Sequence, residues 1–247
     1  MKNKLEYIGS VLHQEQVSLV TIAETTGTPS FVYSKAKLLE QYQALKDALE
    51  GLNFKINYSV KANSNLSILS LLKDEGSGFD IVSAGELGRV LAIGGDPTSV
   101  VFSGVGKSTE EIDFALKNDI GCINVESSSE LDRVIWRAKI LGRKARVSIR
   151  VNPDVDADTH PYISTGLKES KFGVPISQSL SLFEAANQSE HVSLEGIDCH
   201  IGSQISSVTP LAQAIKSICK TIDELSKKKY HHKSRERRRR PRYNLQR

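Results

Sequence analysis

The chain has 247 residues, of which 39% are hydrophobic and 25% are charged, a composition that excludes a disordered or fibrous protein and suits one large domain or two small ones. Its three cysteines are few and widely spaced, which excludes a disulfide framework and indicates a reducing compartment. The net charge of +4 does not indicate nucleic-acid binding by the whole chain, because residues 227–247 hold eleven of the 33 basic residues and one of the 29 acidic residues, which leaves the rest acidic.

Residues 1–30 do not share the repeating pattern that follows them, and we interpret them as an N-terminal extension. They show no apolar run after a basic start, which a signal peptide would have. No stretch of the sequence approaches the roughly 18 apolar residues that a membrane span needs. We therefore expect a cytoplasmic protein without a membrane partner.

Between residues 31 and 226, short apolar segments alternate with longer segments of helical periodicity. Strands are predicted at residues 54–60, 79–83, 100–103, 122–125, 147–151 and 194–200. Helices are predicted at residues 64–73, 83–92, 109–117, 129–141 and 210–225. Several strands are rich in β-branched residues, as strands buried on both faces of a parallel sheet are. Strict alternation of strand and helix predicts right-handed βαβ units and an α/β fold.

Two α/β architectures compete, a doubly wound open sheet and a (β/α)8 barrel. A doubly wound dinucleotide fold should show Gly-x-Gly-x-x-Gly after its first strand, but Lys61-Ala62-Asn63 follows that strand here. Polar residues recur just after the strand ends, where a barrel carries its active site. We therefore expect a partial (β/α)8 TIM barrel over residues 31–226, with about six of the eight βα units.

The first strand places Lys61 on the polar side of an alternating pattern, at the strand's C-terminal end. A lone lysine at such a place is usually a solvated cap. Asp80 and Arg150, however, are charges inside apolar strands, and such charges need partners, so Asp80 is a plausible partner for a lysine or arginine. His200 lies between glycines, which leaves room for a flat ligand. The grouping of these charged and polar residues at one rim of the predicted sheet favours a functional site.

Two further segments resemble ligand-binding loops but lack residues that those loop motifs require. The segment 104–109, GVGKST, lacks the first glycine of a phosphate-binding loop, so we interpret it as a turn into a helix capped by Ser108. The segment 154–160, DVDADTH, lacks the glycine and the glutamate of a calcium loop, so we interpret it as a solvated acidic loop. No metal site is expected.

Six segments of the chain read YSVKANSN, GSGFDIVSAGEL, VVFSGVGKS, NVESSSEL, RVNPDVDADTHPYISTGLKESKFGV and GIDCHIGSQI. Together they resemble the bacterial diaminopimelate decarboxylases, and the resemblance runs from about residue 28 to residue 204. The resemblance implies pyridoxal 5'-phosphate (PLP) as cofactor, an alanine-racemase-like barrel, a homodimer, and conversion of meso-2,6-diaminopimelate to L-lysine and CO2.

The resemblance also implies roles for individual residues. Lys61 corresponds to the lysine that binds the cofactor covalently, and a partly desolvated lysine suits that chemistry because the neutral amine is the reactive form. Asp80 resembles the acid that pairs with this lysine. His200 resembles the histidine that stacks on the cofactor ring, Ser203 the serine that helps to hold its phosphate, and Arg150 the arginine near the ring.

After the predicted helix at 210–225 the sequence departs from that family. The family continues with a glycine-rich phosphate loop, a Glu-Pro-Gly-Arg segment and a second β domain, and residues 227–247 show none of these. A glycine-rich run read in a shifted frame can become a run of arginines, such as residues 237–240. We therefore expect a frameshift near residues 226–232, a disordered basic tail, a largely missing β domain and little activity in this polypeptide.

Other functions stay open on the sequence. One is another decarboxylase of the same family, acting on arginine or a carboxylated polyamine. A second is a PLP-binding barrel without catalytic activity. A third is nucleic-acid binding through the basic tail, because arginine-rich segments bind phosphate backbones without sequence specificity.

Overall fold

The computed structural model describes residues 5–153, 172–203, 205 and 207–227. The chain divides into two compact units, Met1–Phe54 and Lys55–Arg247. The domain limits at residues 30 and 226 remain predictions. The acidic loop expected at 154–160 and the basic segment 228–247 lie outside the described residues.

The first unit contains a small antiparallel sheet and two helices. Its elements are β1 (Leu5–Ile8), β2 (Val11–Gln14), β3 (Val17–Ser18), α1 (Leu19–Thr26) and α2 (Lys35–Ala48), and the strand order is β1-β2-β3. The side chain of Ser34 caps α2 by accepting a hydrogen bond from the backbone N–H of Lys37. No predicted helix corresponds to α2, although Ser34 and the strong helix formers after it are a start signal for one.

The second unit is built on a parallel sheet whose strand order is β10-β8-β7-β6-β5-β4, with β9 beside β8. The strands are β4 (Asn57–Ser59), β5 (Gly78–Ile81), β6 (Val100–Phe102), β7 (Cys122–Val125), β8 (Ala145–Asn152), β9 (Val174–Pro175) and β10 (Val192–Asp198). Every pair in this sheet is parallel. The six predicted strands are therefore confirmed, with β4 three residues long because a 3-10 helix (Val60–Ala62) begins straight after it.

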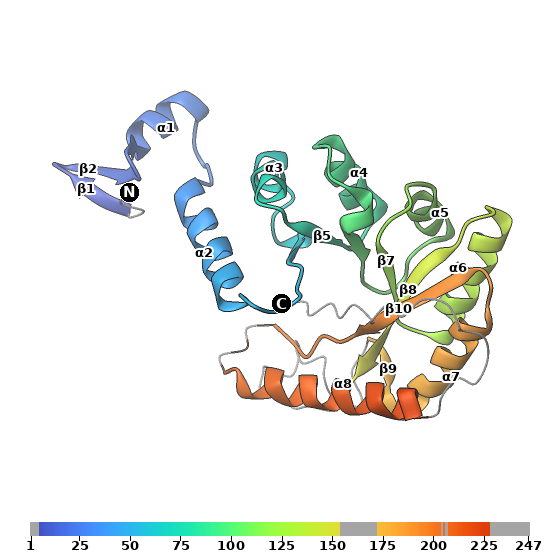
Figure 1. Ribbon diagram of the computed structural model, residues 1–247. Helices are drawn as coiled ribbons and strands as arrows, with labels where there is room; N and C mark the ends of the chain where they lie inside the picture. The colour runs from blue at the N-terminus through green and yellow to red at the C-terminus, as the bar shows by residue number, and fades with distance from the viewer. Residues whose placement is uncertain (1–4, 154–171, 204, 206, 228–247) are drawn as a thin grey trace. The chain divides into compact units, whose positions relative to one another are not determined.

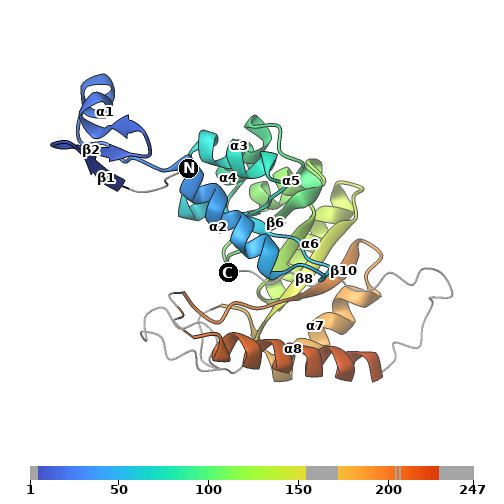
Figure 2. The ribbon, with the colours of Figure 1, turned by 60° about the vertical axis from the view of Figure 1, so that its left-hand side comes forward.

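Helices follow these strands in turn: α3 (Leu66–Asp74), α4 (Ala84–Ala92), α5 (Thr109–Lys117), α6 (Ser128–Ile140), α7 (Ile176–Gln188) and α8 (Thr209–Lys227). Figures 1 and 2 show α3, α4, α5 and α6 in succession along the sheet, as consecutive βα units require. The described residues thus contain the six βα units that the sequence predicts. Helix α7 was not predicted, since no side chain caps its first turn and no acidic residue lies there.

Strands β5, β6 and β7 are buried along their whole length, as expected for inner strands of a parallel sheet. One face is apolar and packs against the helices, with Phe79, Phe102, Ile123 and Ile149 in the main core. The alternate residues of the same strands are largely polar. We call this second side the polar face; it consists of Ser59, Asp80, Asn124, Ser148, Arg150, Asn152 and Asp198.

Serine caps fix the start of three helices at the C-terminal edge of the sheet. Ser83 caps α4, Ser108 caps α5 and Ser127 caps α6, each by accepting a hydrogen bond from a backbone N–H of the first turn. Ser108 forms a full capping box with Glu111, which confirms the reading of 104–109 as a turn into a helix. In the described part of the chain no helix has the length and apolar character needed to cross a bilayer.

Candidate functional site

Lys61 lies in the 3-10 helix that follows β4, and its side chain is exposed. The neighbouring Val60 is fully buried in the main core, so the backbone that carries Lys61 is anchored. The lysine therefore stands at the C-terminal edge of the sheet on a fixed support. This is the place that the strand pattern predicts.

Asp80 is buried in β5, beside Ser59 of β4 in the strand register. The hydroxyl of Ser59 donates to Asp80 Oδ2 over 3.1 Å, and the hydroxyl of Ser103 donates to Asp80 Oδ1 over 2.6 Å. Two donors on one carboxylate favour its charged form. Burial raises the pKa of Glu86 in α4. The negative charge of Asp80 adds to this rise, and the positive charge of Lys61 opposes it.

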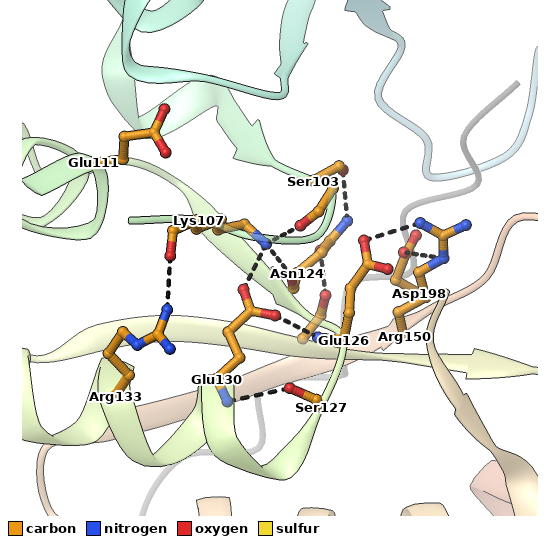
Figure 3. Close-up of polar contacts among 12 residues, drawn as sticks. Ser103, Lys107, Glu111, Asn124, Glu126, Ser127, Glu130, Arg133, Arg150 and Asp198 are labelled. Carbon is orange, nitrogen blue, oxygen red and sulfur yellow. Dashed lines mark hydrogen bonds and ion pairs between the residues drawn. The ribbon is translucent and has the colours of Figure 1, made fainter. Parts of the chain in front are cut away.

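Arg150 of β8 is buried between Glu126, which follows β7, and Asp198 of β10 (Figure 3). Its Nη1 lies 2.9 Å from Glu126 Oε1, and its Nε lies 4.0 Å from Asp198 Oδ2. The guanidinium also lies over the ring of Phe172, 5.6 Å from its centroid. Among the described residues, the ion pairs of Arg150 are with Glu126 and Asp198, so Asp80 stays a predicted partner for Lys61.

Asp198 of β10 is almost fully buried, and burial raises the pKa of its carboxyl to about 7. Arg150 acts in the opposite direction, while the charges of Asp80 and Glu126 add to the rise. One arginine thus faces two carboxyls, and burial makes Asp198 hold its proton more tightly than a solvated aspartate does.

Buried polar atoms without a hydrogen-bond partner gather around this arginine. Within the described ranges they include Glu126 Oε2, Arg150 Nε, both carboxyl oxygens of Asp198 and both amide atoms of Asn152. Each such atom costs on the order of 1–3 kcal/mol when nothing bonds it. A polar ligand or bound water at this place would relieve that cost.

His200 and Ser203 follow β10 at the same edge of the sheet. Burial, together with the positive charges of Arg150 and Lys61, lowers the pKa of the His200 imidazole to about 4. The imidazole is therefore neutral at physiological pH. Ser203 is exposed, and Gly202 between them in the chain is buried.

The Lys107–Glu130 pair was not predicted from the sequence. Lys107, in the turn after β6, is 2% exposed, and its Nζ donates to Gly104 O, Asn124 O and Glu130 Oε1 over 2.6, 2.8 and 2.6 Å. Glu130 Oε2 accepts from the backbone N–H of Glu126 over 2.9 Å. Figure 3 shows that this pair joins the turn after β6 to the start of α6, next to Glu126.

The five predicted site residues thus come from the 3-10 helix after β4, from β5 and β8, and from the segment after β10, all toward the C-terminal edge of one sheet. The positive charges of Lys61 and Arg150 lower the pKa of His200. The charge of Asp80 raises the pKa of Glu86, and the charge of Lys61 lowers it. Among the described residues, no group of three or more His, Cys, Asp or Glu side chains is arranged to hold a metal ion.

Comparison with known proteins gives one consistent result. A family model described as "Pyridoxal-dependent decarboxylase, pyridoxal binding domain" matches residues 35–234. The diaminopimelate decarboxylase of Pseudomonas aeruginosa is 50% identical over 222 residues, which cover 90% of this chain and 54% of that protein. The one from Neisseria meningitidis serogroup B is 50% identical over 212 residues, 86% of this chain and 51% of its own length.

Solved structures agree. The crystal structure of diaminopimelate decarboxylase from Helicobacter pylori complexed with L-lysine superposes with a TM-score of 0.81 at 45% identity, covering 84% of this chain and 53% of that one. A lysine decarboxylase from Selenomonas ruminantium superposes with a TM-score of 0.77 at 27% identity, covering 90% of this chain and 55% of that one. The predicted partial barrel is confirmed, and the chain spans about half the length of the relatives it matches.

Proposed function

Because the chain belongs to the pyridoxal-dependent decarboxylases, we propose that it carries the PLP-binding part of an enzyme that converts meso-2,6-diaminopimelate to L-lysine and CO2 with PLP as cofactor, and that this polypeptide has little of that activity. The observation that carries this proposal is the identity of about 50% to diaminopimelate decarboxylases over some 90% of this chain. The lysine decarboxylase is a more distant relative, at 27% identity. The sequence therefore favours diaminopimelate over lysine as substrate.

The residues at the C-terminal edge of the sheet fit this cofactor. An exposed lysine on an anchored backbone offers an amine, and a neutral imidazole beside a glycine offers a flat surface. The unpartnered polar atoms around Arg150 offer both donors and acceptors to a polar ring or to water. Lys61 would hold the cofactor covalently, His200 would stack on its ring, and Arg150 would lie near it. Ser203 would contact its phosphate.

When bound, the cofactor supplies an electron sink for the bond that breaks as CO2 leaves. The chain's own residues prepare the site for this chemistry. Asp80 places a negative charge on the polar face, and the Glu126–Arg150–Asp198 group holds a positive guanidinium between β7 and β10. His200 stays neutral, so it does not compete as a cation for the anionic groups of a ligand.

Two finer proposals rest on the resemblance. The protein forms a homodimer, and it works in the cytoplasm. Light scattering after gel filtration measures the first, and fractionation of the cells that express the protein measures the second. A monomer at micromolar concentration or a membrane-bound pool would contradict them.

The cofactor proposal is tested by borohydride reduction of the chain mixed with PLP, followed by peptide mapping. We expect the reduced pyridoxyl group on Lys61, and Lys73 serves as an internal control because it is a partly exposed lysine at the end of α3. Substrate choice is tested by CO2 release from meso-2,6-diaminopimelate and from L-lysine, with Lys61→Ala as the inactive control. Labelling spread over several lysines would contradict the assignment of Lys61, and a preference for lysine would contradict the proposed substrate.

A further inference from the structure

A continuous line of side-chain hydrogen bonds crosses five neighbouring strands on the polar face. It runs from Ser148 of β8 to Asn124 of β7, then to Ser103 after β6, to Asp80 of β5, and meets Ser59 of β4. Asn124 is fully buried, and Ser103, Asp80 and Ser148 are at most 6% exposed. Figure 3 shows the link between Ser103 and Asn124.

The chemistry of the groups fixes the direction of every bond in this line. An ionised carboxylate only accepts, so Ser103 must donate its proton to Asp80. The Ser103 oxygen then accepts from Asn124 Nδ2, over 3.0 Å. The Asn124 amide consequently presents Oδ1 to Ser148, whose hydroxyl donates to it. All donors therefore point toward Asp80.

We propose that Ser103, Asn124 and Ser148 are positioning residues, whose oriented hydrogen bonds hold Asp80 in place as an acceptor on the polar face. Such chains are strengthened because each bond polarises the next. The inference rests on the proposed function for its consequence, namely that Asp80 is the acid that acts on Lys61. The hydrogen-bond chain itself can be tested without cofactor or substrate.

Charged groups from several elements surround Asp80 and must stay constant in any test. In the described part of the chain they include Glu86 of α4 and Asp198 of β10, whose pKa values the charge of Asp80 raises, and Lys61 after β4, which acts on the same Glu86. Substitutions at Ser103, Asn124 and Ser148 change none of these charges. A change at Asp80 in such variants therefore reports the loss of hydrogen bonds.

The experiment is a pH titration of the Asp80 side-chain carboxyl carbon by ¹³C NMR in the 247-residue chain, with Asp80→Asn to assign the signal. Ser103→Ala removes a donor to the charged form, so we expect the titration midpoint to rise by about one pH unit. Ser103→Thr keeps the hydroxyl and should restore the midpoint. Ser179→Ala is the matched control, because Ser179 is equally buried but donates to Ile176 O within α7.

The decisive variant is Asn124→Leu, because Asn124 is linked to Asp80 through the hydroxyl of Ser103. We expect a rise of about half a pH unit, since Ser103 loses the donor that orients it. Where Asn124→Leu does not fold, Ser148→Ala at the far end of the chain takes its place, with a smaller rise. A midpoint that is unchanged in Ser103→Ala would overturn the proposal, and one that moves in Ser103→Ala but in neither distal variant would overturn the positioning role of Asn124 and Ser148.

The two proposals fail separately. Absence of the pyridoxyl group from Lys61 would contradict the proposed function while leaving the titration result unaffected. Unchanged midpoints combined with labelling of Lys61 would contradict the hydrogen-bond chain alone.

Discussion

Lys107 is a buried cation whose three ammonium protons all have acceptors, one of them the buried carboxylate of Glu130. Breaking such a pair by removing one partner is more harmful than removing both charges, because the remaining charge stays buried without compensation. We expect Lys107→Met to lower the free energy of unfolding by about 3–5 kcal/mol. Urea denaturation of the folded chain measures the change.

The matched variant combines Lys107→Met with Glu130→Gln. The glutamine has no charge, and its oxygen can still accept from the backbone N–H of Glu126. We expect this double variant to recover a substantial part of the lost stability. Equal losses in the single and double variants would show that packing of the lysine stem, not the buried charge, decides the effect.

Single residues could be predicted from the sequence where a strand pattern marks them. Alternation around 54–60 and 79–83 predicts Lys61 and Asp80 on the polar side. Asp80 lies there in β5, whereas Lys61 lies in the 3-10 helix that follows β4. Lys107 and Glu130 are 23 residues apart, and no sequence pattern around either residue predicts their contact. Finding it requires knowing that β6 and β7 are neighbours and how deep the turn after β6 lies.

At the scale of elements, the edge between β6 and β7 depends on Gly121. A Cβ at this position would lie 2.4 Å from Thr98 O and 2.9 Å from Val100 O, which are backbone atoms that cannot turn away. We expect Gly121→Ala to lower the free energy of unfolding by about 1–3 kcal/mol through this overpacking. Thermal or urea unfolding of the variant measures it.

Gly88 in α4 is the control, because its added Cβ would meet nothing within 4 Å. Alanine is favoured over glycine inside a helix, so Gly88→Ala should raise the free energy of unfolding by up to about 1 kcal/mol. The two variants thus carry the same substitution, with opposite expected changes in the free energy of unfolding. Stabilisation by Gly121→Ala would contradict the close approach of β6 and β7.

Elements with apolar periodicity and a capping serine were predicted within a few residues, as α4, α5 and α6 are. Helix α7 lacks these signals, because serines occupy its first turns and one of them, Ser179, is fully buried. Its burial comes from packing against β8 and β10, which local sequence does not encode. The division after Phe54 is likewise a property of three-dimensional contacts.

For the whole molecule, two buried groups at the candidate site give stability opposite dependences on pH. Asp198 keeps its proton up to about pH 7 in the folded state, whereas its ordinary pKa is 3.8, so its contribution to stability falls as pH rises through that window. His200 has a folded pKa of about 4 against an ordinary 6.5, so its contribution falls as pH drops through that window. In the unchanged chain the two slopes offset each other between about pH 4 and 6.5.

Replacing one of these two residues should reveal the pH dependence of stability that the other one causes. Relative to the unchanged chain, we expect Asp198→Asn to gain stability progressively from pH 4.5 to 7.5, because the asparagine needs no proton to stay neutral. His200→Gln should show the reverse, with its relative stability highest at pH 4.5 and declining toward pH 6.5. Urea unfolding at four pH values measures both differences, and the charges common to all three proteins cancel in them. Parallel stability curves for the three proteins would mean that neither group is held in the folded state in the way its burial implies, and the polar face around Arg150 would then be open to water.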